Sequence, residues 1–274
     1  GVGLLHPVPL VLGQFETPQG QFLYSVRNGQ AVIDTWRVSD SGAVSLAGRA
    51  QLPLGSGIAG TEISDIEVVN LADRNFMVSV SALGNYVAVQ KLSADGTVGG
   101  ATTLWADRGL GLNQPTHLTT VTVGSVTYVV VASSQSSSLT TLRLTYSGEL
   151  LPSDHILDEL TTRFQGATAL DSVTINGRAY IFVGGGDDGI SVFTMMPEGR
   201  LLHLVTLADA NDRAMANVSA LSAAVIDGQI VLFVASKTES GITQFAFDPG
   251  QIGITRVVGE GRQDGTSGND MMQA

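Results

Sequence analysis

The sequence predicts an all-β fold, a five-bladed β-propeller of four-stranded antiparallel blades, and three observations lead to this prediction. One unit of about fifty residues is written five times along the 274-residue chain. Each copy contains four short runs rich in apolar and β-branched residues, separated by turn residues. The copies stay in phase, because the second run begins at intervals of 54, 52, 52 and 51 residues, at Phe22, Phe76, Tyr128, Tyr180 and Val231. A fixed period of this length with four strands per repeat is typical of a β-propeller.

The clearest copy of the unit runs from Phe164 to Leu207. Asn176-Gly177 separates its first two runs and predicts a type I′ hairpin turn, because both central residues of that turn need positive φ. A glycine-rich loop, residues 184–189, leads to the third run, and Pro197-Glu198-Gly199 leads to the fourth. The unit is therefore predicted to be a four-stranded antiparallel meander.

The other copies carry equivalent turns, and these set the predicted boundaries of the blades. A glycine follows every third run, at Gly42, Gly96, Gly148, Gly199 and Gly250. We predict one propeller domain over residues 1–258, with blades at about 8–52, 61–104, 115–157, 164–207 and 217–258. A larger ring, completed by residues outside this chain, stays open as an alternative.

Composition excludes several classes of partner and site. The net charge is −11 and only 14 residues are Lys or Arg, without a basic cluster, so neither nucleic acid nor an anionic membrane is an expected partner. The chain has no cysteine, which excludes disulfides, thiolate metal sites and cysteine nucleophiles. No apolar run approaches the length of a membrane span. Residues 4–13 lack a basic region and contain two prolines, which indicates a lead-in to the first blade rather than a signal peptide.

Three connections between predicted blades share a charge pattern. They are residues 105–117, 157–167 and 207–217, and in each an acidic residue precedes an arginine. In a propeller these connections lie on the same face as the loops between second and third strands, and ligands usually bind there. The candidate ligand-face residues are Trp105, Asp107, Arg108, Arg163, Asp187, Asp188, Asp212 and Arg213. The alternative is that these charges form salt bridges between neighbouring blades.

The five first strands are expected to line the propeller axis. Side chains alternate along a strand, so the residues on either side of the aligned apolar position share a face. That face carries Asp65, Glu67, His117 and Asp171. Three carboxylates could hold Ca²⁺ or Mg²⁺, with His117 as a base or a further ligand. The alternative is a water-filled channel lined by polar groups.

This arrangement resembles lactonase-type propellers in architecture, and the resemblance implies a metal and carboxylates near the axis. The sequence departs from that family, which has six or seven blades, and no run matches its motifs. The chain also lacks the G-x-S-x-G, H-E-x-x-H and Walker motifs.

The repeat pattern stops after Val258, and residues 259–274 are polar and rich in glycine, as expected of a flexible tail. Residues 265–272, GTSGNDMM, resemble the nonapeptide G-G-x-G-x-D-x-U-x of the repeats-in-toxin (RTX) family. Gly265, Gly268, Asp270 and Met272 fit the motif, whereas Thr266 replaces its second glycine. The resemblance implies that Asp270 is a calcium ligand and that the tail opens a parallel β-roll. A single repeat supplies half of a calcium site.

Together these features predict a secreted, RTX-type calcium-binding protein, exported through a C-terminal signal outside this chain. Its propeller would be a non-enzymatic recognition or scaffold module for a glycan, a surface or a protein partner. The alternative is a metal-assisted hydrolase or lyase at the propeller axis. The sequence does not identify a ligand.

Overall fold

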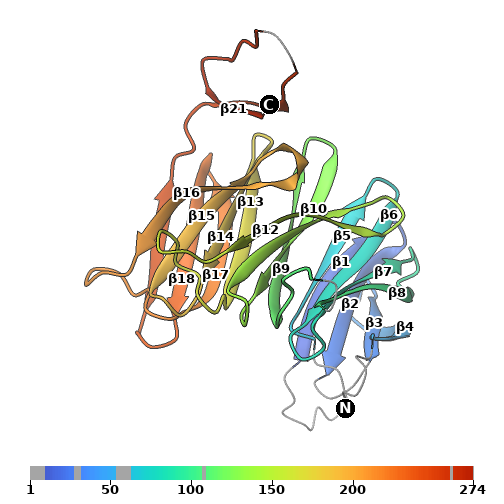
Figure 1. Ribbon diagram of the computed structural model, residues 1–274. Helices are drawn as coiled ribbons and strands as arrows, with labels where there is room; N and C mark the ends of the chain where they lie inside the picture. The colour runs from blue at the N-terminus through green and yellow to red at the C-terminus, as the bar shows by residue number, and fades with distance from the viewer. Residues whose placement is uncertain (1–9, 28–31, 54–62, 107–108, 260–261, 274) are drawn as a thin grey trace. The chain divides into compact units, whose positions relative to one another are not determined.

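The computed structural model describes residues 10–27, 32–53, 63–106, 109–259 and 262–273. Nearly all of these residues belong to β-strands or to the tight turns between them, as Figure 1 shows. Within the described part of the chain, no helix has the length and apolar character needed to cross a bilayer. The predicted all-β class is confirmed.

The strands form four antiparallel sheets of four strands, one sheet of three strands and one parallel pair. Strands within each antiparallel sheet follow one another in chain order. The first sheet contains β1 (Leu10–Thr17), β2 (Gly20–Arg27), β3 (Val32–Val38) and β4 (Val44–Gln51). The second sheet contains β5 (Asp65–Leu71), β6 (Arg74–Ser81), β7 (Tyr86–Leu92) and β8 (Val98–Trp105). The third sheet contains β9 (Pro115–Val123), β10 (Val126–Ser133), β11 (Ser138–Leu144) and β12 (Leu150–Leu157). The fourth sheet contains β13 (Ala169–Ile175), β14 (Arg178–Gly184), β15 (Gly189–Met195) and β16 (Leu201–Ala208). The fifth sheet contains β17 (Val218–Ile226), β18 (Gln229–Ser236) and β19 (Ile242–Phe247). The parallel pair consists of β20 (Ile252–Val257) and β21 (Asn269–Gln273).

The chain forms two compact units, which we describe separately. The first comprises Gly1–Trp105 with Tyr146–Gly148, and the second comprises Ala106–Thr145 with Glu149–Ala274. In the first unit β1 contacts β5, and in the second β13 lies against both β9 and β17. Neighbouring sheets within a unit therefore approach one another through their first strands, as the blades of a propeller do.

The predicted hairpin turns are present. Asn176 and Gly177 have φ values of 49° and 77°, as a type I′ turn requires, and Asp227 and Gly228 repeat this geometry at 50° and 79°. The sequence therefore located the turn at Asn176-Gly177 correctly, and Asp227-Gly228 is an equivalent turn that it did not single out.

Aromatic residues at the start of second strands pack on the turn glycine of the following sheet. A Cβ at Gly96 would collide with the ring of Phe22, and one at Gly199 would collide with the ring of Tyr128. Both glycines have positive φ, at 87° and 81°. The aromatic positions and the turn glycines that align the repeats are thus the two halves of one contact between sheets.

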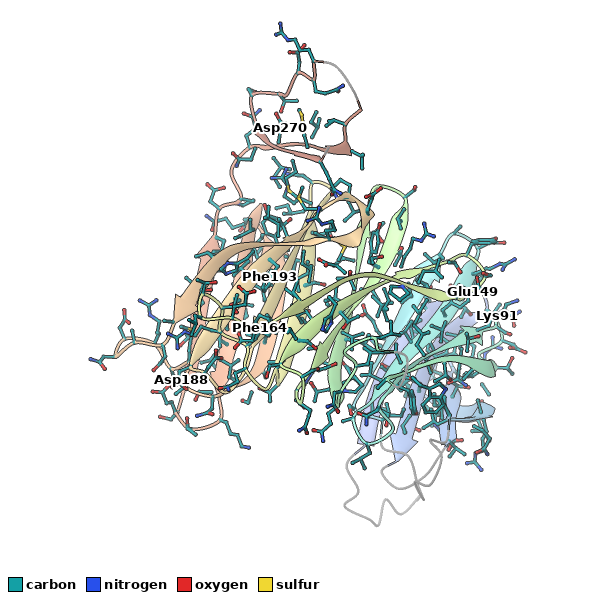
Figure 2. All side chains as sticks on the ribbon, in the orientation of Figure 1. Lys91, Glu149, Phe164, Asp188, Phe193 and Asp270 are labelled. Atoms are coloured by element: carbon teal, nitrogen blue, oxygen red, sulfur yellow. The ribbon has the colours of Figure 1, made fainter. Side chains whose placement is uncertain are left out.

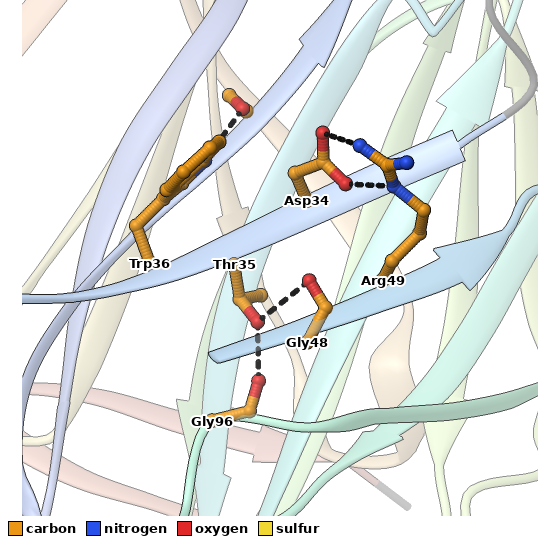
Figure 3. A network of polar contacts seen from close by, with 7 residues as sticks. Asp34, Thr35, Trp36, Gly48, Arg49 and Gly96 are labelled. Atoms are coloured by element: carbon orange, nitrogen blue, oxygen red, sulfur yellow. Dashed lines mark hydrogen bonds and ion pairs between the residues drawn. The ribbon is translucent and has the colours of Figure 1, made fainter. Parts of the chain in front are cut away.

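A buried threonine on the third strand strengthens the same junction. The Thr35 hydroxyl on β3 donates to the carbonyl of Gly96 at 2.6 Å (Figure 3). In the second unit Thr141 on β11 donates to the carbonyl of Gly199 at the same distance. A buried hydroxyl needs such a partner, so each of these bonds fixes the position of the next sheet's turn.

The fifth sheet differs from the prediction, which placed residues 254–258 in its outer strand. Among the described residues it contains β17, β18 and β19, whereas β20 pairs in parallel with β21. Four residues connect β19 to β20, but five connect β15 to β16. The polar segment after residue 258 thus supplies a strand that competes for β20, and the expectation of a flexible tail did not include it.

Candidate functional site

The connections between blades in the second unit are anchored by three fully buried apolar side chains. Leu112, Phe164 and Met215 each have 0% of their surface exposed. The residue two positions later is in the left-handed region each time, namely Gln114, Gly166 and Asn217. Phe164 also meets the ring of Phe193 edge-on, with centroids 5.9 Å apart; both rings are labelled in Figure 2. These anchors set the positions of the charged side chains around them.

Carboxylates in these connections accept hydrogen bonds from the backbone of the anchors. Asp158 Oδ1 accepts the N–H of Phe164 at 3.0 Å, and Asp209 Oδ1 accepts the N–H of Met215 at 2.9 Å. In both cases the acceptor lies six residues before the anchor. The acidic residues of the two connections thus stabilise the backbone of the loop.

The paired aspartates of the β14–β15 loop act in the same way. Asp187 Oδ1 accepts the N–H of Gln165 at 3.1 Å, and Asp188 Oδ1, labelled in Figure 2, accepts the N–H of Asn217 at 3.0 Å. Burial, and then the negative charge of Asp158, raises the pKa of the Asp187 carboxyl above its ordinary value. Arg163 Nη1 donates to the backbone carbonyl of Asp187 at 2.8 Å.

Among the described ligand-face residues of the second unit, Arg163, Asp187 and Asp188 therefore bond to backbone groups. Among the described ligand-face residues, the ion pair is between neighbours in sequence, Arg213 Nε and Asp212 Oδ1, at 3.0 Å on an exposed surface. Such exposed pairs contribute little to stability. Asp107 and Arg108 lie outside the described residues.

Trp105 was expected in an irregular loop, but it is the last residue of β8. Its indole lies edge-on to the buried ring of Tyr86, with centroids 5.1 Å apart. Because it is partly buried in this packing, Trp105 contributes to the core of the first unit.

An open groove of about 870 Å³ lies between the connection into the fifth sheet and the start of β19. Residues 209–214 form one wall, and residues 238–244 form the other. Asp212 and Arg213 line it, together with Asn211, Thr238 and Gln244, which we did not single out in the sequence. These residues belong to loops and a strand with no motif of their own, and the sequence carries no signal for the groove, because the fifth repeat contains a run that fits an outer strand.

The candidate axial residues belong to different units. Asp65 and Glu67 lie on β5 in the first unit, and both raise the pKa of nearby Tyr24, which burial and these charges bring to about 12. The Tyr24 hydroxyl donates to the carbonyl of Ile66 at 3.1 Å and so joins β2 to β5.

His117 on β9 and Asp171 on β13 lie in the second unit. The Asp171 carboxylate is engaged by backbone, since Oδ1 accepts the N–H of Ser172 and Oδ2 the N–H of Ala223, both at 2.7 Å. Burial raises the pKa of this carboxyl despite the two hydrogen bonds. Asp171 thereby links β13 to β17.

No group of three or more His, Cys, Asp or Glu side chains placed to hold a metal occurs among the described residues. A ring of Asp65, Glu67 and Asp171 would join the two units, and it stays a prediction. Of the aligned apolar residues, Ile66, Leu118 and Leu170 are buried as expected, whereas Leu12 is 61% exposed.

In the tail, Asp270 is surrounded by hydrogen-bond donors. Its Oδ1 accepts the Thr266 hydroxyl at 2.7 Å and the N–H of Ile254 at 2.8 Å, and its Oδ2 accepts the N–H of Thr266 at 2.6 Å. The Thr266 hydroxyl, followed by these N–H groups, holds the pKa of Asp270 below its ordinary value. A Cβ at Gly253 or Gly265 would collide with this carboxylate, so the close approach requires both glycines.

No protein-family model matches the sequence, and no curated protein sequence is significantly similar to it. Solved structures with the same fold were found. A protein from Lactobacillus plantarum matches with a TM-score of 0.57 and 17% identity, over 83% of this chain and 67% of that chain. The periplasmic gluconolactonase PpgL of Pseudomonas aeruginosa matches with a TM-score of 0.54 and 13% identity, over 86% and 69%. An exo-β-1,3-galactanase of Phanerochaete chrysosporium matches with a TM-score of 0.51 and 10% identity, over 81% and 55%.

These likenesses show the fold. The chain has a β-propeller fold that resembles that of a lactonase, as its repeats predict. At 17% identity or less they do not carry the activity of the matched proteins to this chain.

Proposed function

We propose that the chain is the propeller part of a secreted, RTX-type calcium-binding protein, and that the propeller is a recognition module without catalytic activity. Export would use a C-terminal signal outside this chain. The observation that carries the proposal is the geometry around Asp270.

The β20–β21 pair supports the calcium part of the proposal. The two strands are parallel, and the paired residues Ile252 and Asn269 are 17 positions apart. Two nonapeptides of a calcium-binding β-roll would span about 18 residues per coil. The carboxylate of Asp270 lies against Gly253 of the preceding strand and Gly265 of the turn. Its lowered pKa keeps it ionised at neutral pH, which a calcium ligand requires.

A calorimetric calcium titration of the full chain, stripped of metal beforehand, tests this part. Half of a site should bind weakly, with a Kd of about 10⁻⁴ to 10⁻³ M. Asp270→Asn should abolish the binding. Asp264→Asn should keep it, because Asp264 pairs with Arg262 at 2.9 Å on an exposed part of the same tail. Full binding by Asp270→Asn, or none by the wild type, would contradict the proposal.

The groove beside β19 supports the recognition part. Its polar side chains are hydroxyl, amide, carboxyl and guanidinium groups, which match the donors and acceptors of sugar hydroxyls. The Asp209 and Glu239 carboxylates already accept the N–H groups of Met215 and Ala216, at 2.9 Å in both cases. Asn211 and Gln244 are then the residues best suited to contact a glycan, and the partner would be a cell-surface or matrix glycan.

Binding of the chain to a panel of immobilised glycans tests this part. Asn211→Ala and Gln244→Ala should each weaken binding several-fold, since each removes a pair of amide hydrogen bonds. Gln135→Ala is the matched control, because Gln135 is an exposed amide in the β10–β11 loop. Equal binding by all three variants, or no binding to any glycan, would contradict the glycan assignment.

One observation favours the alternative, a metal-assisted hydrolase or lyase. Asp65 and Glu67 lie together on β5, where they add to the effect of burial in raising the pKa of Tyr24, so negative charge is concentrated on this strand. In the same calorimetric titration, binding that survives Asp270→Asn but is lost in Asp65→Ala/Asp171→Ala would place the ion at the inner strands and favour the enzyme.

A further inference from the structure

The outer edge of β19 is open, unlike the corresponding edges of the other sheets. In the four-stranded sheets the third strand, β3, β7, β11 or β15, pairs on its outer side with a fourth strand. The sheet order β17-β18-β19 ends at β19 within the described part of the chain. Ile242 on this strand is 70% exposed. An open edge presents unpaired N–H and C=O groups that favour addition of another strand.

The groove lies where a fourth strand of the fifth sheet would run. In the fourth sheet the preceding connection meets the third strand, because the N–H of Arg163 donates to Ser191 Oγ at 2.8 Å. It also meets the fourth strand, because Thr206 of β16 donates to the carbonyl of Thr161 at 2.7 Å.

In the fifth sheet only the first of these contacts is repeated. The N–H of Ala214 donates to Thr243 Oγ1 at 2.8 Å, and the place corresponding to Thr206 is open groove. The third sheet supports this comparison, since His155 of β12 occupies the equivalent space and a Cβ at Gly111 would collide with its ring.

The strand that fits this place by sequence is β20. It follows the turn glycine Gly250, as β16 follows Gly199. In the four-stranded sheets the carbonyl just after the turn glycine accepts an N–H from four residues earlier; for Arg200 the donor is Met196, at 2.7 Å. In the fifth sheet the equivalent carbonyl, that of Gln251, accepts the N–H of Asn269 instead, at 2.7 Å.

The present pairing of β20 is short and irregular. Its register with β21 is interrupted between Ile252 and Thr255, and the N–H of Ile254 donates to the side chain of Asp270 rather than to a strand carbonyl. Parallel pairing is weaker than antiparallel pairing. The buried side chain of Met271 and the bond from Arg178 to the carbonyl of Asn269 anchor β21 rather than β20. The Asp270 carboxylate therefore holds β20 where strand pairing alone holds it poorly.

We propose that the outer edge of β19 is an acceptor site for β20 of the same chain, and that Asp270 holds β20 away from it. Release of Ile254 from Asp270 lets β20 swing about the four-residue connection Asp248–Gln251 and complete the fifth blade. The exchange fills the groove along β19. The movement of β20 depends only on strand pairing and on the Asp270 contact, and it requires neither calcium nor a glycan.

Hydrogen–deuterium exchange on the full chain in EDTA, measured by mass spectrometry, tests whether β20 moves from β21 to β19. In Asp270→Ala, amides of β21 should exchange faster while amides of β19 exchange at least tenfold more slowly than in the wild type. Asp264→Ala removes the same charge from the tail and should leave both regions unchanged. Faster exchange in β20 and β21 with unchanged β19 amides would overturn the proposal, since β20 would then be released into solvent.

A disulfide trap tests the same pairing independently, because the chain has no cysteine of its own. In the fourth sheet Phe193 is opposite His203, and the corresponding residues of the fifth sheet are Phe245 and Ile254. The double variant Phe245→Cys/Ile254→Cys should form an intramolecular disulfide on mild oxidation, with a higher yield in the Asp270→Ala background. Each single-cysteine variant reports intermolecular crosslinking. Absence of the intramolecular bond in both backgrounds would overturn the proposal.

Discussion

The fourth and fifth sheets of the second unit come from the same sequence repeat, yet they differ at their outer edges. In the fourth sheet β16 pairs with β15 along seven residues, and Thr206 reaches the preceding connection. In the fifth, β20 leaves the blade and pairs with β21. The inner parts of the two sheets are alike, since both use a buried anchor in the connection, a type I′ first hairpin and an apolar second strand.

The difference teaches that an outer strand's partner is not determined by its own sequence pattern. No residue of the fourth strand β16 is fully buried, so little apolar burial ties it to its sheet. A turn shortened by one residue and a competing set of hydrogen bonds around Asp270 are sufficient to redirect it. The second strands β6, β10 and β14 have less freedom, because nearly all of their side chains are buried.

The largest expected effect concerns the anchors, which the two sheets share. Phe164→Ala should lower the free energy of unfolding by about 3–5 kcal/mol, because it leaves a cavity in a fully buried position. Met215→Ala should lower the free energy of unfolding by about 2–5 kcal/mol. The loss should be smaller than for Phe164→Ala, because the three-stranded fifth sheet can relax around the cavity. Urea denaturation measures both. Leu160→Ala, at a fully exposed position in the same connection, should change stability by less than about 0.5 kcal/mol. A larger loss for Met215→Ala would mean that the fifth sheet is the better packed of the two.

A smaller difference is expected at the two turn glycines. Gly199 has φ of 81° and lies under the ring of Tyr128, whereas Gly250 has φ of 64° and meets only the side chain of Asn269 at ordinary contact distance. Substitution by alanine at either position should lower the free energy of unfolding by about 1–2 kcal/mol, because the backbone there is in the left-handed region. Gly199→Ala should cost more because the added methyl group also displaces Tyr128. Thermal unfolding of the two variants compares them, and equal losses would show that the ring contact contributes nothing.

The smallest effect is a difference in pH dependence between the blades and the tail. The folded-state pKa of Asp270 is lowered, so its stabilising effect is present above its ordinary value of 3.8 and is lost as the pH falls through the folded pKa. The pKa of Asp171 is raised, so its ionisation opposes folding, and the resulting cost disappears as the pH falls below 3.8. On acidification from pH 6 to pH 3, amides of β21 should lose protection before those of β13 and β17.

Hydrogen exchange corrected for intrinsic rates measures this, with Asp270→Asn as the control. That variant should show the unprotected tail already at pH 6. Loss of protection in β13 at a higher pH than in β21 would contradict the assigned directions.

Sequence reasoning located the elements of the fold better than the chemistry of the loops. Phe22 and Gly96 were aligned by their recurrence, and the structure shows why they recur, since one packs on the other in the next sheet. Asp187 and Asp188 were identified as candidates, but sequence could not show that they cap the N–H groups of Gln165 and Asn217. Those partners are 22 and 29 residues away, and only the packed loops bring them within reach.

The sequence by itself determined the repeat, the strands and the hairpin turns, because period-two burial and the positive φ of Asn-Gly are local properties. The tertiary structure decided which carboxylates cap backbone groups and whether β20 joins its blade. Both outcomes depend on competition between partners distant in sequence. Asn269 and Asp270 hold β20 beside β21 through hydrogen bonds to Gln251 and Ile254. The sequence of residues 252–257 does not itself show whether β20 pairs with β21 or with β19.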